Sequence, residues 1–218
     1  MSPGSSETQL HRGQSVFTTG APLEGARAAM LMLHGSGASA QDILSLANEL
    51  DQAEFAFLAP QAAGNTWYPN RFIAPIEQNE PWLSSALGIV ADLLSFIMNS
   101  GIAAEQIILL GFSQGACLAL EFAARNMRRY GGLVGLSGAL IGPDDAPRNY
   151  SGSLLGTPVF LGCSDADFLV PRERVDQAAG VFNAYGGAVT EQIYPNMGHE
   201  VNQDELDFVC GMMKELVK

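Results

Sequence analysis

Charged residues are scarce in this 218-residue chain, and basic residues are especially few. Asp, Glu, Lys and Arg make up 16% of the sequence, against about 25% in a typical soluble domain. Lys and Arg number 11 whereas Asp and Glu number 23, which gives a formal net charge of −12. Binding to nucleic acid or to an anionic membrane surface requires a concentration of basic residues. The charge balance therefore argues against both kinds of partner.

Long apolar runs and a signal peptide are also missing from the sequence. No stretch reaches 18 uninterrupted apolar residues, so the sequence predicts no membrane span. The opening residues contain neither the basic nor the apolar region of a signal peptide. Residues 1–14 are polar overall, and we expect them to be loosely held.

Cysteine is rare, with Cys117, Cys163 and Cys210 as the three examples. An odd number of widely spaced cysteines predicts thiols in a reducing compartment rather than a disulfide framework. The spacing of His and Cys fits no metal site, and the phosphate-binding pattern G-x-x-x-x-G-K-[ST] does not occur. We therefore expect a cytoplasmic protein that uses no metal or other cofactor.

Apolar residues are plentiful, at 47% of the chain, and the length suits one domain with a sizeable core. We find no internal repeat, low-complexity tract or linker, so we assign residues 1–218 to a single domain. Short apolar runs without alternation are typical of strands that are covered on both faces in a parallel sheet. The predicted strands are Ala28–Leu33, Phe55–Leu58, Gln106–Leu110, Leu133–Leu136, Pro158–Gly162 and Gln192–Tyr194.

Stretches with apolar residues at helical spacing separate these strands. The predicted helices are Ala40–Leu50, Trp82–Met98, Gln114–Arg128, Pro171–Tyr185 and Gln203–Lys218. This alternation predicts a three-layer α/β fold, in which helices cover both faces of a mostly parallel central sheet. Two connections, residues 60–81 and 138–157, are long, as functional or disordered loops usually are. Trp67 and Tyr68 in the first loop are candidates for a pocket wall, and packing against neighbouring helices is the alternative.

Residues 111–115 read Gly-Phe-Ser-Gln-Gly and match G-x-S-x-G. A predicted strand runs into this motif and a predicted helix leaves it, which is the context in which such a turn exposes a serine hydroxyl. Two similar segments, residues 135–139 and 162–166, are not followed at once by a helix. We therefore predict that Ser113 is a nucleophile, and the alternative is a tight glycine-rich turn that serves only packing.

A serine hydroxyl is a weak nucleophile until a base takes its proton. In hydrolases that use this motif, the chain order is serine, acid and then histidine. Of the three histidines, only His199 follows Ser113 late enough to be that base. We expect His34 to brace its turn and His11 to lie in the loosely held N-terminal segment.

The acid that orients this histidine should lie at the carboxyl end of a strand. The predicted strand Pro158–Gly162 is followed by Asp165 and Asp167, and because these share parity, alternation leaves both open. Acyl transfer also needs two N–H donors for the oxyanion. The backbone N–H groups of Gln114, directly after the serine, and of Ser36, after the first strong strand, are the candidates.

The loop that contains Ser36 also supports a different hypothesis. Residues 35–40 match the dinucleotide-binding pattern G-x-G-x-x-A between a predicted strand and a predicted helix. That pattern requires an acidic residue about 20 positions later to bind the ribose. The next strand ends in Phe-Leu-Ala-Pro-Gln, without a carboxylate. We therefore do not expect a bound nucleotide.

From about Ala26 onward, the chain resembles the carboxylesterase, phospholipase and acyl-protein thioesterase family of the α/β-hydrolases. The resemblance implies the α/β-hydrolase fold, and its acidic motif, Asp-Phe-Leu-Val-Pro at residues 167–171, selects Asp167 over Asp165. The motifs that carry it are Leu-His-Gly-Ser-Gly at 33–37, Gly-Phe-Ser-Gln-Gly at 111–115, residues 165–171 and Gly-His at 198–199.

The resemblance implies a serine hydrolase that cleaves carboxylic esters through an acyl-enzyme, with a small-molecule ester as its substrate. The chain is too short for a large inserted lid, which favours small to medium acyl chains. Because many relatives pair, a homodimer is also implied. Ser36 and Phe168 replace a leucine and a proline of the thioesterases, which favours a bacterial-type esterase. The alternatives are an acyl-thioesterase or lysophospholipase and, in another class, a non-catalytic ligand-binding protein on a hydrolase scaffold.

Overall fold

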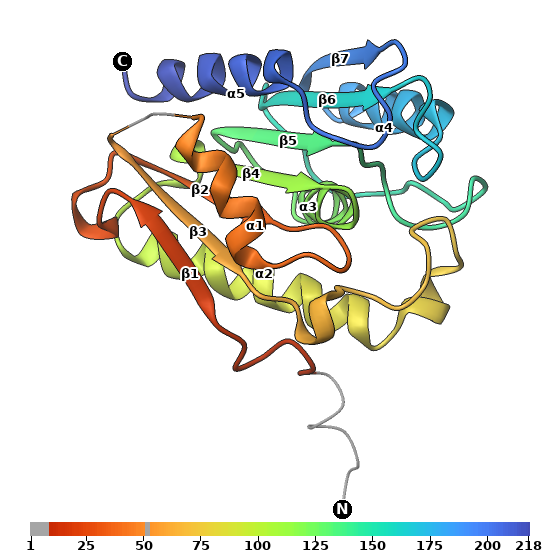
Figure 1. Ribbon diagram of the computed structural model, residues 1–218, viewed down its shortest axis with the longest axis horizontal. Helices are drawn as coiled ribbons and strands as arrows, with labels where there is room; N and C mark the ends of the chain where they lie inside the picture. Colours follow the sequence, from red (N-terminus) through yellow and green to blue (C-terminus); the bar gives the residue numbers. More distant parts are fainter. Residues whose placement is uncertain (1–8, 51–52) are drawn as a thin grey trace, which may run out of the picture.

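The computed structural model describes residues 9–50 and 53–218, and its centre is a seven-stranded sheet (Figure 1). The strand order is β1-β3-β2-β4-β5-β6-β7. Neighbouring strands from β2 to β7 pair in parallel, whereas β1 pairs antiparallel with β3, so the predicted mostly parallel sheet is confirmed. The strands are β1 Val16–Gly20, β2 Ala28–Leu33, β3 Phe55–Pro60, β4 Ile107–Phe112, β5 Gly132–Leu136, β6 Pro158–Ser164 and β7 Ala188–Tyr194.

Helices cover both faces of this sheet (Figure 1). They are α1 Ala40–Ser45, α2 Trp82–Asn99, α3 Gln114–Arg125, α4 Arg172–Ala184 and α5 Gln203–Leu216. Successive residues of a strand point to opposite faces. In β2, Ala29 and Leu31 pack with α2, α3 and α4, whereas Met30 and Met32 pack with α1 and α5. The predicted three-layer α/β architecture is therefore confirmed.

The observed boundaries differ from the predicted ones for local reasons. α1 is shorter than predicted because the chain tightens into a 3-10 turn at Leu46–Asn48. α3 ends at Arg125 because Asn126 leaves helical geometry. β7 begins at Ala188 rather than at Gln192. Its residues are exposed or half-buried, so the first half of the strand contains no apolar run that would predict it.

No apolar run in the sequence predicts β1. This strand reads Val-Phe-Thr-Thr-Gly, is mostly exposed, and pairs along one edge only, from Val16 opposite Pro60 to Gly20 opposite Ala56. An antiparallel edge strand can face water and needs no continuous apolar run. The signal by which the inner strands are recognised is therefore missing from β1.

His11 contradicts the expectation of a loosely held N-terminal segment, whose residues 1–8 lie outside the described residues. The His11 side chain is buried. Its Nδ1 accepts the Ala63 N–H at 3.0 Å, and its Nε2 donates to the Trp67 carbonyl at 3.0 Å. Its own N–H donates to Ser85 Oγ at 3.0 Å. The expectation is wrong at this residue because the ring satisfies backbone groups of the 60–81 loop.

By length and composition, α2 could cross a membrane, with a mean hydropathy of 1.4 over its 18 residues. The segment contains no uninterrupted apolar run of that length because serines and Asp92 interrupt it. Its inward residues recur at the spacing of one helix face and belong to the core that packs on the sheet. These residues are Leu83, Ala86, Val90, Leu94 and Ile97.

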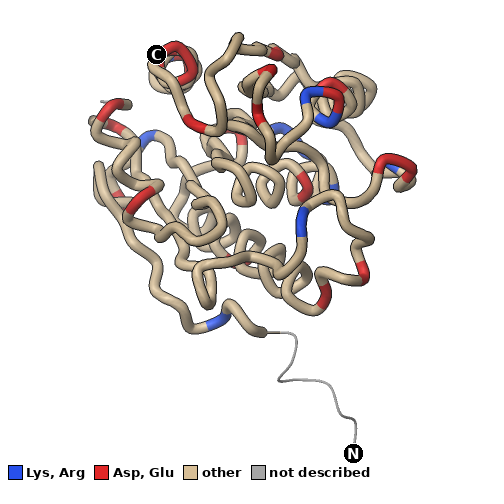
Figure 2. The backbone as a smooth tube through the Cα atoms, turned by 45° about the vertical axis from the view of Figure 1, so that its right-hand side comes forward, with Lys and Arg blue, Asp and Glu red and all other residues tan. Residues whose placement is uncertain are grey.

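Charged residues lie mainly at the periphery, and acidic segments outnumber basic ones (Figure 2). In the part of the chain that the structure describes, four charged side chains are buried, namely Glu121, Asp167, Arg174 and Glu205. Burying a charge is costly unless it is paired or hydrogen-bonded. Glu121 accepts a hydrogen bond from Arg125 at 2.7 Å, and Arg174 donates to backbone carbonyl groups. Asp167 belongs to the site described next.

Candidate active site

Ser113 lies at a sharp turn between β4 and α3. Its φ and ψ angles are 55° and −120°, and a positive φ is uncommon for a residue with a side chain. A Cβ on Gly111 would lie 2.2 Å from the Gly115 carbonyl oxygen, and a Cβ on Gly115 would lie 2.1 Å from that of Leu33. The Ser113 N–H donates to the Leu136 carbonyl at 2.9 Å. The glycine spacing of the motif therefore has a steric cause.

Three polar side chains from separate segments meet at this turn. His199 Nε2 lies 2.8 Å from Ser113 Oγ, and His199 Nδ1 lies 2.7 Å from Asp167 Oδ2. Asp167 follows β6 and His199 follows β7, at the carboxyl ends of two neighbouring parallel strands. The imidazole therefore links the serine hydroxyl to the carboxylate in one hydrogen-bonded series.

The Asp167 carboxylate is held by several groups at once. Its Oδ1 accepts N–H bonds from Leu169 at 2.8 Å and from Val170 at 3.0 Å, and its Oδ2 lies 3.8 Å from Cys163 Sγ. Burial by itself would raise the pKa of Asp167, but the hydrogen bonds from His199 and these N–H groups outweigh burial and lower it. The carboxylate is therefore ionised at neutral pH and can orient the imidazole.

Cys163 is in contact with this carboxylate and remains a neutral thiol. Burial, together with the nearby charge of Asp167, raises the pKa of Cys163 to about 12. Burial likewise raises the pKa of Cys117 to about 11. Because only a thiolate is a strong nucleophile, neither sulfur competes with the Ser113 hydroxyl.

The other candidates for acid and base have different partners. Asp165 Oδ1 accepts the Asn196 N–H at 2.7 Å, which fastens the loop after β7. His34 Nδ1 donates to the Gly35 carbonyl at 2.8 Å, and its Nε2 accepts the Ala62 N–H at 3.1 Å. His34 therefore braces two loops.

The predicted oxyanion donors lie at the same cavity as Ser113. Gln114 is the first residue of α3, so its N–H has no partner within the helix. Among the hydrogen bonds of residues 9–50 and 53–218, none uses the Ser36 N–H. Both N–H groups are therefore free to bind an oxyanion.

The side chain of Gln114 has a role that the sequence analysis missed. Its Oε1 accepts the Trp67 N–H at 2.8 Å and the Thr66 hydroxyl at 3.1 Å, and its Nε2 donates to the Tyr68 carbonyl at 2.7 Å. These bonds tie the start of α3 to the 60–81 loop. The G-x-S-x-G motif does not specify the side chain at position 114, so the sequence contains no signal for this contact.

A cavity of about 240 Å³ opens beside Ser113. Its lining includes Tyr68 and Phe72 from the 60–81 loop, Cys117 from α3 and Leu169 from the acid loop. Next to it, the Phe168 ring is 78% exposed and lies 6.4 Å, centroid to centroid, from the His199 ring. The site is therefore a small cavity lined by both apolar and polar residues, and an exposed aromatic ring lies near its histidine.

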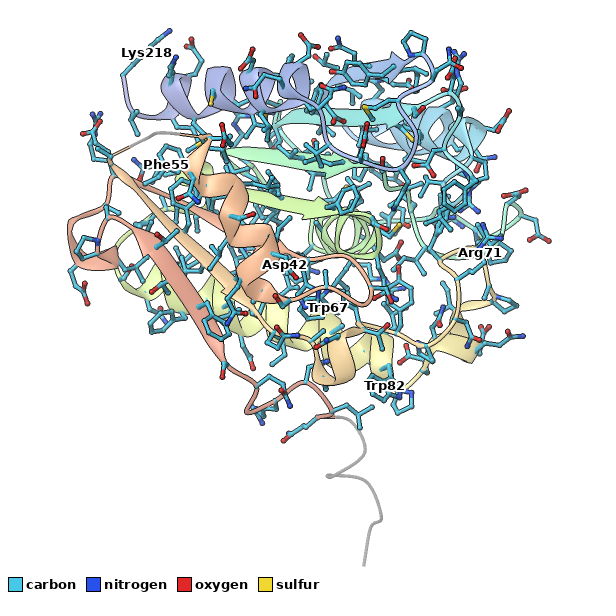
Figure 3. All side chains as sticks on the ribbon, viewed as in Figure 1. Asp42, Phe55, Trp67, Arg71, Trp82 and Lys218 are labelled. Carbon is cyan, nitrogen blue, oxygen red and sulfur yellow. The ribbon has the colours of Figure 1, made fainter. Side chains whose placement is uncertain are left out.

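Of the two aromatic residues predicted to line a pocket, Tyr68 does so and Trp67 does not. Trp67 is fully buried, and its Nε1 donates to the His34 carbonyl at 2.8 Å (Figure 3). Its ring packs 5.0 Å from the His34 ring and 5.5 Å from the His11 ring. The prediction for Trp67 is wrong because its indole is buried against His11 of the N-terminal segment and His34 after β2.

Tyr68 is buried at the cavity wall. Its hydroxyl has no hydrogen-bond partner among the residues that the structure describes. Burial, reinforced by Cys117, raises the pKa of Tyr68 well above its usual value. The hydroxyl is therefore a neutral donor.

Within the same described residues, no group of three or more His, Cys, Asp or Glu side chains could hold a metal ion.

Residues 16–216 match the phospholipase/carboxylesterase family. This chain belongs to that family. A solved structure of phospholipase/carboxylesterase from Dyadobacter fermentans is 42% identical, with a TM-score of 0.88, over 94% of this chain and 97% of that one. The resemblance inferred from the motifs and the α/β-hydrolase fold are thereby confirmed.

Two fungal relatives extend the comparison within the family. Acyl-protein thioesterase 1 of Saccharomyces cerevisiae is 28% identical over 89% of this chain and 95% of its own length. Acyl-protein thioesterase 1 of Gibberella zeae is 32% identical over 57% of this chain. That match covers 54% of the Gibberella protein, which is about half its length.

Proposed function

We propose that this protein is a serine hydrolase that cleaves carboxylic esters of small to medium acyl chains. The observation that carries the proposal is the series of two short hydrogen bonds that joins Ser113 through His199 to Asp167 beside a cavity. Membership of the phospholipase/carboxylesterase family supports ester hydrolysis independently. The expected substrate is a small-molecule ester. We further propose a cytoplasmic location, because widely spaced cysteine thiols fit a reducing compartment.

In the proposed mechanism, Ser113 Oγ attacks the ester carbonyl carbon while His199 Nε2 takes the hydroxyl proton. The Asp167 carboxylate stabilises the imidazolium that forms. The N–H groups of Ser36 and Gln114 hold the oxyanion. The C–O bond to the alcohol then breaks, and the imidazolium returns the proton to the leaving oxygen. Water repeats these steps on the acyl-enzyme and releases the acid.

The size of the cavity supports the proposed range of acyl chains. At about 240 Å³, it lies below the roughly 300–1,000 Å³ of pockets that enclose drug-sized ligands. Tyr68 and Phe72, which form part of its wall, are both buried. We therefore expect kcat/KM for p-nitrophenyl esters to rise from acetate to a short or medium chain and then to fall.

Thioester hydrolysis is the second candidate function. It is favoured by the relatives in Saccharomyces cerevisiae and Gibberella zeae that bear the name acyl-protein thioesterase 1. The same nucleophile and oxyanion donors would act on either bond. Matched butyryl oxoester and butyryl thioester substrates, assayed side by side, distinguish the two, and the larger kcat/KM identifies the preferred bond.

Reaction with a fluorophosphonate tests the hydrolytic mechanism against a non-catalytic ligand-binding role. We expect a mass increase located on Ser113 in the wild type and none in Ser113→Ala, together with loss of esterase activity in that variant. As a matched control, Ser137→Ala should keep both, because Ser137 is a buried serine that does not line the cavity. A wild-type protein that is neither labelled nor active would favour the ligand-binding role.

A further inference from the structure

Arg71 is the one charged residue in the lining of the cavity beside Ser113, as far as the described residues show. It belongs to the 60–81 loop and lies at the right of the molecule in Figure 3. The rest of the lining consists of neutral polar, apolar and aromatic residues. In a chain with a net charge of −12, this cavity therefore presents a positive charge.

The Arg71 guanidinium is held in place by a neutral partner. One of its terminal nitrogens donates to the Leu169 carbonyl at 3.0 Å, and Leu169 lines the same cavity. Within the described residues, Arg71 forms no ion pair. Six other arginines do pair with a carboxylate, namely Arg12, Arg27, Arg125, Arg148, Arg172 and Arg174. Because a guanidinium carries five N–H donors, most donors of Arg71 are left for a ligand.

We propose that Arg71 binds a carboxylate carried by the substrate, so that the preferred substrates are esters with a free carboxylate group. This inference rests on the proposed function and adds the chemical class of the substrate. A guanidinium matches a carboxylate with two parallel hydrogen bonds, which a neutral acyl chain cannot form. No acidic side chain lies in the described lining to compete for the guanidinium or to repel the anion.

The test compares anionic and neutral esters in two matched pairs. One pair is p-nitrophenyl hemiglutarate and p-nitrophenyl pentanoate, which places the carboxylate on the acyl chain. The other pair is 4-acetoxybenzoate and phenyl acetate, which places it on the leaving group. For each pair, the anionic-to-neutral ratio of kcat/KM is measured after subtraction of spontaneous hydrolysis, in wild type, Arg71→Gln and Arg71→Lys.

We expect Arg71→Gln to lower this ratio about tenfold or more in at least one pair, because hydrogen bonds between charged groups are the stronger kind. Arg71→Lys should give an intermediate ratio, since lysine keeps the positive charge but lacks the two parallel N–H donors of the guanidinium. Arg172→Gln, which removes an exposed positive charge on α4, should leave both ratios unchanged. Equal ratios in wild type and Arg71→Gln for both pairs would overturn the proposal. An equal loss of kcat/KM on the anionic and the neutral ester gives such an unchanged ratio.

A binding measurement keeps this test separate from the test of hydrolysis. Calorimetric titration of glutarate and pentanoate into wild type and Arg71→Gln should show tighter glutarate binding that depends on Arg71. If wild type cleaves none of the four esters, the proposed function fails, and the titration still decides whether Arg71 binds a carboxylate. Equal glutarate affinity in the two proteins, or none in either, counts against the Arg71 proposal.

Discussion

At the scale of single residues, the contacts of two neighbouring aspartates separate their roles. Asp167 meets His199 Nδ1, whereas Asp165 meets the Asn196 N–H. We expect Asp167→Asn to lower kcat by roughly 10³–10⁴, because an amide facing Nδ1 favours the wrong imidazole tautomer. Asp165→Asn, the matched control, should cost only a few-fold. Steady-state kinetics with a p-nitrophenyl ester measures both, and a larger loss in Asp165→Asn would reverse the assignment.

Ser113 could be predicted from its local context and His199 from the chain order, whereas Asp167 was selected over Asp165 by its resemblance to the family's acidic motif. Burial of His11 and Trp67 follows from no such signal. It depends on how two segments about 55 positions apart in the chain pack together, and neither segment contains a periodic pattern. The three catalytic candidates were therefore predictable, whereas the packing of the loop that closes the cavity was not.

At the scale of elements, the turn between β4 and α3 depends on the absence of a side chain at Gly115. We expect Gly115→Ala to lower the free energy of unfolding by about 3 kcal/mol or more, because its Cβ would collide with the Leu33 backbone. Gly180→Ala, in the middle of α4 with open space around it, should instead stabilise by about 0.5–1 kcal/mol. Urea denaturation measures both, and a near-native Gly115→Ala would contradict the steric account.

The start of α5 contains a buried acidic residue, Glu205. Its Oε2 accepts the Asn202 N–H, while its Oε1 has no hydrogen-bond partner among the described residues. Burial raises the pKa of Glu205 to about 7, above the ordinary 4.5. The folded state therefore holds this proton more tightly than the unfolded state, and stability falls as pH rises from about 4.5 to about 7.

Replacing this carboxyl group tests its effect on stability. From pH 5 to pH 8, the free energy of unfolding of Glu205→Gln should rise relative to that of wild type, by up to about 3 kcal/mol. The reason is that the amide cannot ionise. Glu215→Gln, at an exposed position on the same helix, removes the same charge and should show no such gain. Urea denaturation at both pH values measures the difference, and parallel curves for wild type and Glu205→Gln would show that Glu205 does not titrate as described.

Predictability also differed between elements. The inner strands and the five helices were recognisable because each carries its own apolar pattern, as Ala28–Leu33 does in full burial. β1 was not, because its identity as a strand comes from pairing with β3 rather than from its residues. Tertiary pairing that leaves one face in water leaves little trace in composition.

At the scale of the whole molecule, two buried histidines brace the loops around the site in a way that permits only the neutral ring. His11 and His34 each accept a backbone N–H with one ring nitrogen and donate to a carbonyl with the other. Protonation would place a second proton where a backbone N–H already points. Burial lowers the pKa of both residues below the usual 6.5. The unfolded chain therefore binds more protons, and stability falls as pH drops below about 6.5.

This loss of stability at acid pH is opposed by Glu205 and by Glu191, because burial and the nearby Asp176 also raise the pKa of Glu191 to about 7. The effect of the histidines is therefore best measured in a variant that carries both Glu205→Gln and Glu191→Gln. There, we expect the free energy of unfolding to be lower at pH 5 than at pH 7, because His11 and His34 bind protons only after unfolding. Adding His11→Gln and His34→Gln should flatten that dependence, since glutamine can donate and accept one hydrogen bond but does not titrate in this range. If the slope between pH 5 and pH 7 persisted without both histidines, the acid sensitivity would have to come from other groups, and the histidine braces would be ordinary packing.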